Sequence, residues 1–146
     1  MSPDQPKDTR RDRVLVYCDG GARGNPGPAA IGAVVLDPST DPPAELATVS
    51  ERIGTATNNV AEWRALVAGL EAARAFPSRR ISVRADSQLV LRQLEGVYRV
   101  KQAHLRPYYA EARALLADYD EVDLAHVPRE GNVVADALVN AALDGT

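Results

Sequence analysis

Four acidic residues lie where the folding pattern of this 146-residue chain could bring them together. Asp19 and Asp86 each follow a short apolar run that is typical of a buried strand. Glu62 falls in the first turn of an expected helix, and Asp136 falls near the start of another. Glu62 precedes Leu66 by four residues, so the two share one helix face and the acid should point inward. The placement of these acids predicts one cluster of carboxylates.

Clustered carboxylates repel one another and raise each other's pKa unless cations neutralise them. With one cysteine and two histidines in all, the chain cannot assemble a cysteine and histidine zinc cluster, so any metal must be held by oxygen ligands. Such ligands favour Mg²⁺ or Mn²⁺, and two ions about 3.5–4 Å apart can drive an in-line phosphodiester displacement by water. Taken singly, each acid is better explained as a solvated surface charge or a charge at a helix end, but that explanation is not favoured for the four acids together.

A segment rich in glycine and proline, residues 20–28, follows the first of these acids. It matches neither of the glycine-rich patterns that bind nucleotide phosphates, and a strand rather than a helix is expected after it. It can instead present backbone N–H groups and the Asn25 amide to a sugar and phosphate, or it can be a tight turn without a ligand.

Several other polar residues have two interpretations. One of Asn58 and Asn59 suffices to cap the helix that carries Glu62, which leaves the other free to contact a base edge or a 2′-hydroxyl. Arg129 lies in the loop before Asp136 and is either a functional group or an ordinary solvated arginine.

Two further residues are expected to be structural. His126 falls in an expected strand on the face of Val122 and Leu124, which indicates a buried or half-buried histidine. Cys18, in a buried strand, is expected to be an inert core residue.

An alternation of strands and helices must position all these residues. We expect strands at residues 14–18, 29–36, 45–52, 81–85 and 122–127, and helices at about 58–76, 87–94, 107–118 and 132–141. Glycines should stop the first strand, Ser87 and Asn132 should cap helices, and Pro107 suits a first turn.

The order of these elements predicts an α/β fold, in which a mixed sheet carries helices on its faces. Strands two and three form an antiparallel hairpin, whereas the right-handed crossover rule makes strands one, four and five parallel. Ligands of such sheets bind beyond the carboxyl ends of the parallel strands, where Asp19 and Asp86 both fall.

Composition limits the classes of protein to be considered. With 45% hydrophobic and 25% charged residues the chain fits one compact domain, and no apolar stretch approaches the roughly 20 residues of a membrane helix. Residues 1–13 lack the apolar segment of a secretory signal, so we expect a disordered N-terminal extension, a domain over residues 14–146 and a cytoplasmic location. A formal net charge of −3 excludes attraction of nucleic acid by bulk charge.

Four blocks of sequence resemble the type 1 ribonuclease H family, in the family's order and with an acid in each: YCDGGARGNPGP, TNNVAEW, RADSQLV and HVPREGNVVADAL. The resemblance covers about residues 14–143. It implies the ribonuclease H fold, with a five-stranded sheet ordered 3-2-1-4-5. It also implies endonucleolytic, Mg²⁺-dependent hydrolysis of the RNA strand of an RNA–DNA hybrid, which leaves a 5′-phosphate and a 3′-hydroxyl.

The resemblance also implies roles for individual residues. The family's metal-binding carboxylates, which hold two Mg²⁺ ions with Mn²⁺ as a substitute, match Asp19, Glu62, Asp86 and Asp136. Positions that contact the hybrid in its minor groove match Gly20, Asn25, Asn59 and Gln88. Recognition of the 2′-hydroxyl would select the RNA strand.

The chain departs from the family at two places. Many members carry a flexible loop histidine before the fourth acid; an ungapped count puts His126 there, but strand pairing puts it in the sheet, so we assign the loop's function to Arg129. Many members also insert a basic helix where this chain has only residues 97–106, and we assign substrate binding there to Lys101. Few phosphates can then be neutralised, which predicts weak, strongly salt-dependent binding.

Two alternatives stay open. The chain could be a binding module for hybrid or structured RNA without turnover, or a nuclease of the same fold that cuts DNA. In every case we expect a monomer that binds nucleic acid and no membrane.

Overall fold

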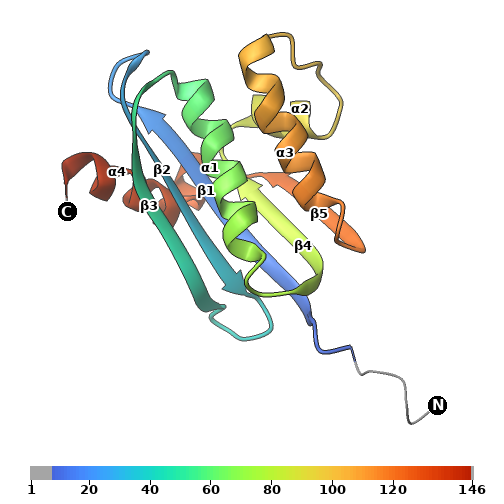
Figure 1. Cartoon of the computed structure of the whole chain (residues 1–146). Helices are drawn as coiled ribbons and strands as arrows, with labels where there is room; N and C mark the ends of the chain where they lie inside the picture. The colour runs from blue at the N-terminus through green and yellow to red at the C-terminus, as the bar shows by residue number, and fades with distance from the viewer. Residues whose placement is uncertain (1–7, 146) are drawn as a thin grey trace.

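A computed structural model of the chain describes residues 8–145 (Figure 1). The elements are β1 (Arg11–Ala22), β2 (Gly27–Asp37), β3 (Ala44–Ala56), α1 (Asn58–Ala73), β4 (Ser78–Ala85), α2 (Gln88–Leu94), the 3₁₀ helix η1 (Ala103–Leu105), α3 (Arg106–Leu116), β5 (Glu121–His126), the 3₁₀ helix η2 (Arg129–Gly131) and α4 (Val133–Asp144). The predicted order of strands and α helices is confirmed.

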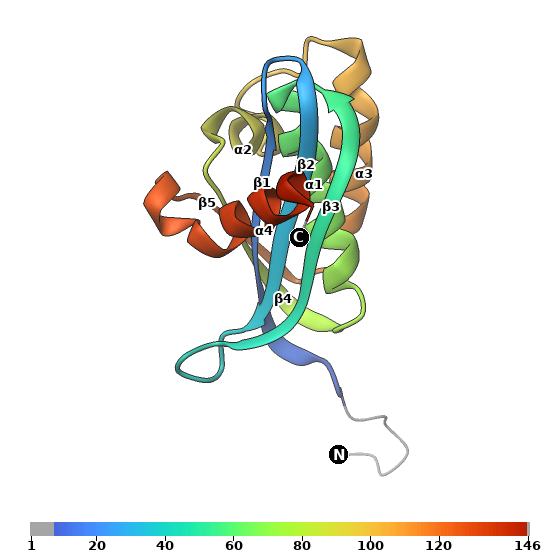
Figure 2. The ribbon, with the colours of Figure 1, turned by 90° about the vertical axis from the view of Figure 1, so that its left-hand side faces the viewer.

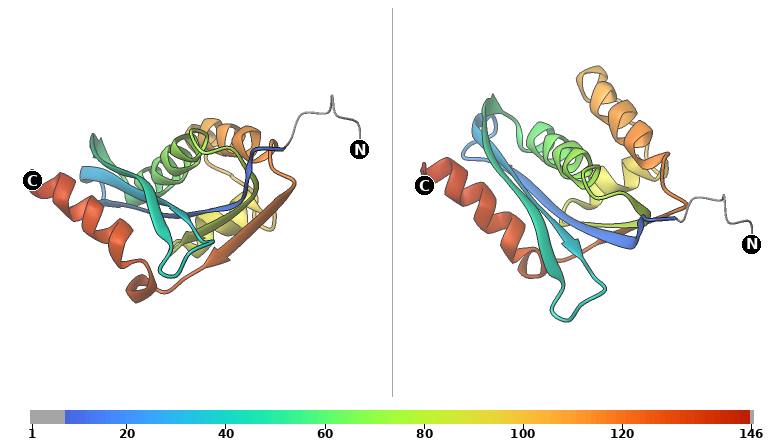
Figure 3. Two further views of the ribbon diagram at one scale, coloured as in Figure 1. Left: turned by 90° about the horizontal axis from the view of Figure 1, so that it is seen from below. Right: turned by 60° about the horizontal axis from the view of Figure 1, so that its bottom comes forward.

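The five strands form one mixed sheet in the order β3-β2-β1-β4-β5. Strand β2 runs antiparallel to both β1 and β3, whereas β4 is parallel to both β1 and β5. Helices α1 and α3 lie on one face and α4 crosses the other (Figures 2 and 3). The predicted α/β class, strand order and parallel set are therefore confirmed.

The main core lies between the sheet and helices α1, α2 and α3. Helix α1 places Trp63, Leu66 and Leu70 on one stripe, and all three are fully buried. The Trp63 ring meets Tyr109 of α3 edge to face, at 6.3 Å between ring centroids, which joins the two helices. A smaller cluster beneath α4 contains Ala30 and Val139. Within the described residues, no helix is both long and apolar enough to cross a membrane.

Strand β1 is longer than predicted at both ends. It begins at Arg11, which pairs with Ser78, so residues 11–13 belong to the sheet and not to a disordered extension. It also continues through the glycines, because Gly20 still pairs with Ile31 of β2 although the ladder to β4 ends at Cys18. Asp19 therefore lies inside β1 and not after it. The expectation for residues 1–7 lies outside the described residues.

The helix starts differ from the prediction in two of three cases. Thr57, not an asparagine, caps α1, since its Oγ1 accepts a hydrogen bond from the Val60 N–H at 3.2 Å. Ser87 caps α2 as predicted, by accepting from the Val90 N–H at 3.3 Å. Asn132 occupies the N-cap position of α4, but its side chain makes no capping hydrogen bond.

Candidate active site

A cleft of about 440 Å³ opens where β1 and β4 end, and the four predicted acids all line it: Asp19, Glu62, Asp86 and Asp136. Each acid comes from a different segment: β1, α1, the turn after β4, and α4. All four are half-buried. The structure thus brings together side chains that are separated by up to 117 residues of sequence (136 − 19).

Local structure explains why the acids meet. Alternation along β1 buries Cys18 and Gly20 against α1 and turns Asp19 towards the face that α4 covers. Helix α4 comes close because Gly32 of β2 has no side chain: a Cβ there would stand 2.4 Å from the Ala135 carbonyl oxygen. That approach places Asp136, the next residue, at the cleft.

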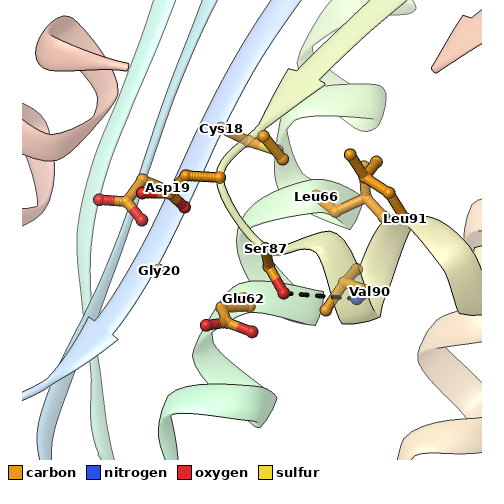
Figure 4. Close-up of a pocket in the computed structure, with 10 residues that line it drawn as sticks. Cys18, Asp19, Gly20, Glu62, Leu66, Ser87, Val90 and Leu91 are labelled. Atoms are coloured by element: carbon orange, nitrogen blue, oxygen red, sulfur yellow. Dashed lines mark hydrogen bonds between the residues drawn. The ribbon is translucent and has the colours of Figure 1, made fainter. Parts of the chain in front are cut away.

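Burial and neighbouring carboxylates raise the pKa values of Asp19 and Glu62. Burial, and then the negative charges of Asp86 and Asp136, raise the pKa of Asp19 to about 7. Burial also raises the pKa of Glu62, although a hydrogen bond from the Ser87 hydroxyl opposes that rise. Figure 4 shows Ser87 beside Glu62, with its bond to the Val90 amide. Such mutual repulsion is what a bound cation would relieve.

The donors available in the cleft suit a hard divalent cation. Its ionisable lining consists of carboxylates together with Arg23 and Arg129. Cys18 is buried beside Asp19, and burial raises the pKa of its thiol, so it offers no thiolate ligand. Within residues 8–145, no three acidic, histidine or cysteine side chains are already gathered around one point. The carboxylates therefore fit Mg²⁺ or Mn²⁺ by chemistry, and they line the cleft without closing on a single position.

The asparagines at the rim make an interlocking contact. Asn25 Oδ1 accepts from the Asn58 backbone N–H at 3.0 Å, and Asn58 Oδ1 accepts from the Ala22 N–H at 2.8 Å. The contact fixes the loop between β1 and β2 against the start of α1. Asn58 thus has a structural role as an anchor of the loop, and Asn25 is exposed on that anchored loop.

Two predicted substrate residues lie away from the acids. Asn59 and Lys101 line a separate groove of about 520 Å³ beside α2, together with Gln93. Asn59 Oδ1 and Gln93 Oε1 are buried there without a hydrogen-bond partner among the described residues. Of the others, Gly20 is buried against α1 at the cleft, and Gln88 is exposed at the start of α2.

Arg129 lies at the cleft, whereas His126 lies at the end of an edge strand. Arg129 lies in η2, exposed at the cleft, with Nη2 3.7 Å from Asp136 Oδ1. His126 is the last residue of β5, so it belongs to the sheet as strand pairing predicted. The prediction that it is buried or half-buried is wrong, because β5 is an edge strand and His126 is exposed at its end. Its Nε2 lies 3.2 Å from the Asp86 carbonyl oxygen.

Sequence reasoning missed two residues that hold α4 in place. Ser50 Oγ donates to the Leu138 carbonyl at 2.6 Å, and Arg52 Nε donates to the Ala142 carbonyl at 2.7 Å. Both come from β3 and bond to backbone atoms of α4, so no motif marks them.

The sheet order, the helices on both faces and the acid-lined cleft define a ribonuclease H-like protein. A family model described as reverse transcriptase-like matches residues 17–142. The chain is 47% identical to Ribonuclease HI of Halobacterium salinarum over 135 residues, which cover 92% of this chain and 66% of that protein. The chain belongs to the type 1 ribonuclease H family.

Solved structures agree with this assignment. The crystal structure of RNase H1 from Halobacterium salinarum matches with a TM-score of 0.84 and 46% identity, covering 92% of this chain and 99% of that one. LC11-RNase H1 in complex with an RNA/DNA hybrid matches with a TM-score of 0.81 and 39% identity, covering 90% and 97%.

The chain is shorter than the full relatives. It spans 66% of the Halobacterium protein, and only 36% of a bifunctional protein of Mycobacterium tuberculosis to which it is 43% identical over 132 residues, or 90% of this chain. Within residues 8–145, the 3₁₀ helix η1 is the only helix between α2 and α3, so no longer helix is inserted there.

Proposed function

We propose that this chain is an endoribonuclease that hydrolyses the RNA strand of RNA–DNA hybrids. The observation that carries the proposal is the convergence of four carboxylates from four segments on one cleft. Similarity to Ribonuclease HI of Halobacterium salinarum and to an RNase H1 bound to an RNA/DNA hybrid supports the choice of substrate.

In this proposal Asp19, Glu62, Asp86 and Asp136 hold two Mg²⁺ ions, for which Mn²⁺ can substitute. When bound, these ions supply the Lewis acidity that activates water and stabilises the leaving oxygen in an in-line displacement, giving a 5′-phosphate and a 3′-hydroxyl. The raised pKa of Asp19 supports a cation site, because the carboxylates need positive charge to ionise together at neutral pH.

The remaining residues recognise the hybrid or assist departure of the product. Gly20, Asn25, Asn59 and Gln88 contact the minor groove, and contact with the 2′-hydroxyl selects the RNA strand. Lys101 lies in the neighbouring groove and contacts a phosphate of the duplex backbone. The duplex therefore extends from the cleft into that groove. Arg129, exposed at the cleft beside Asp136, assists the leaving group.

The test is cleavage of end-labelled hybrid, duplex DNA and duplex RNA, each with Mg²⁺ and with EDTA. We expect Mg²⁺-dependent cleavage of the RNA strand of the hybrid only. Asp86→Asn should abolish cleavage, whereas Asp118→Asn, an exposed acid at the end of α3, should not. Binding without cleavage would identify a binding module, and cutting of duplex DNA would identify a DNA nuclease.

We also propose that the chain acts as a monomer in the cytoplasm. Light scattering after size-exclusion chromatography measures the oligomeric state, and a dimer at micromolar concentration would contradict the proposal of a monomer.

A further inference from the structure

Asn132 stands at the N-cap of α4 but does not act as a cap. It is only 1% exposed, and its side chain makes no bond to the helix that follows it. Its Nδ2 instead donates a hydrogen bond of 2.9 Å to the backbone carbonyl of Cys18, which is 114 residues away in sequence. An asparagine at this position would ordinarily satisfy a free N–H of its own helix.

The carbonyl that Asn132 holds lies next to a predicted metal ligand. Cys18 is the last residue of β1 that pairs with β4, and Asp19 follows it directly. The backbone carbonyl of Asn132 accepts a hydrogen bond of 3.0 Å from the Asp136 N–H. One residue therefore connects the backbones that carry Asp19 and Asp136.

Only one half of the Asn132 amide has a hydrogen-bond partner among the described residues. Its Oδ1 is buried and has no hydrogen-bond partner among the described residues. The amide cannot simply turn over, because Oδ1 would then face the Cys18 carbonyl oxygen. Asn132 therefore buries one oxygen without a partner while its amide nitrogen is directed at the Cys18 carbonyl, and that bond to β1 is the interaction that distinguishes this side chain from an ordinary helix cap.

We propose that Asn132 is a positioning residue of the metal site. By fixing the Cys18 carbonyl to the start of α4, it sets the separation of Asp19 from Asp136 before a cation binds. Replacing a group that orients metal ligands in this way typically weakens metal binding by about 10-fold or more. The proposal rests on the proposed function, since it assumes that these two acids share a cation.

The experiment is titration calorimetry of Mn²⁺ into the full chain and its variants, together with their thermal unfolding in EDTA. Asn132→Leu keeps the branch at Cγ and removes the donor, and Asn132→Ala removes both. Ser78→Ala is the matched control: Ser78 is also buried, and its Oγ donates to the Phe76 carbonyl at 2.8 Å, at the opposite end of the sheet. Asp19→Asn is the control for loss of a ligand.

We expect both Asn132 variants to bind Mn²⁺ about 10-fold or more weakly than the unaltered chain. Ser78→Ala should bind normally even though its Tm falls. If Asn132→Ala does not fold, the Leu variant decides. A loss of less than fivefold in the folded Leu variant overturns the proposal. Failure of the unaltered chain itself to bind Mn²⁺, or normal binding by Asp19→Asn, would instead overturn the metal site and with it the proposed function.

Discussion

Gly20 of β1 is in backbone contact with Ala61 of α1. A Cβ added at Gly20 would stand 2.1 Å from the Ala61 carbonyl oxygen and 2.6 Å from the Glu62 amide nitrogen. No side chain fits at these separations, so the bare Cα lets α1 approach β1 and places Glu62 at the cleft. The resemblance to other family members implies a hybrid contact at Gly20, and the structure adds this packing role.

Gly20→Ala should therefore damage both stability and activity. Backbone must move to admit the methyl group, which should lower the unfolding free energy by about 1–3 kcal/mol. The displaced Glu62 should reduce hybrid cleavage by about 100-fold. Gly21→Ala is the control, because its Cβ would meet only the Val139 side chain at an ordinary 3.8 Å. Urea unfolding and cleavage rates check both; equal effects of the two substitutions would contradict the packing argument.

Asp19 should make the metal-free protein less stable as pH rises. Its pKa is raised from 3.8 to about 7 in the folded chain. Between those values the folded state keeps a proton that the unfolded chain has lost, so the unfolding free energy falls across that range and the full penalty is present above pH 7. Asp19→Asn removes the charge and should inactivate the protein while stabilising it.

Asp19→Asn should raise the unfolding free energy by about 1–2 kcal/mol at pH 8, after allowance for partial exposure of the carboxyl group. The gain should be much smaller at pH 5. Urea unfolding in EDTA at the two pH values measures the difference, with Asp118→Asn as the comparison for loss of an exposed acid. A gain that is equal at both pH values would show that Asp19 is not the group responsible.

The sequence was sufficient to predict the elements that carry the acids. Strand β4 ends at Ala85, so the local pattern placed Asp86 directly after a strand. Helix α1 shows a regular apolar repeat, so the local pattern also placed Glu62 on that helix. The convergence of Asp19 and Asp86 followed from the rule that ligands of such sheets bind beyond the carboxyl ends of the parallel strands. By contrast, the end of β1 was placed too early, because glycine weakens a strand locally but pairing with β2 continues through it.

Side-chain contacts between distant elements could not be predicted. Asparagine is favoured at helix starts whether or not it caps, so nothing in the local pattern separates Thr57, which caps, from Asn132, which bonds to β1. The bonds from Ser50 and Arg52 to α4 cross 88 and 90 residues of sequence and likewise have no local signal. Exposure of His126 depends on the absence of a neighbour beyond β5 among the described residues.

Arg129 should contribute more to turnover than His126. Arg129 is exposed, and its 3.7 Å ion pair with Asp136 is of the kind that contributes little, so the guanidinium is free to move. His126 is held at the Asp86 carbonyl oxygen. Arg129→Ala should lower kcat by about 10-fold with little change in KM. Steady-state cleavage of a labelled hybrid measures both constants, and Arg129→Lys keeps the charge as a control. A larger kcat loss in His126→Ala, at an unchanged Tm, would reverse the assignment.

Hybrid binding should be weak and should depend strongly on salt, with Lys101 as one of few phosphate contacts. The segment between α2 and α3 carries Arg99 and Lys101. Helix α3 begins at Arg106, but the Arg106 guanidinium is engaged with the Val100 and Lys101 carbonyls at 3.3 and 3.4 Å. Arg99 and Lys101 are left to face the groove. Lys101→Ala should reduce the slope of log K against log salt by about 1, because one fewer counterion is released.

Fluorescence anisotropy with the cleavage-deficient Asp86→Asn protein measures this slope between low and physiological salt. Arg79→Ala is the matched control, since Arg79 has the same charge but lies near Asp8 and Asp120, at the end of β4 away from the cleft. Its slope should equal that of the Asp86→Asn parent. A nanomolar Kd at physiological salt would show that contacts other than phosphate neutralisation dominate, and an unchanged slope in Lys101→Ala would place the duplex elsewhere on the surface.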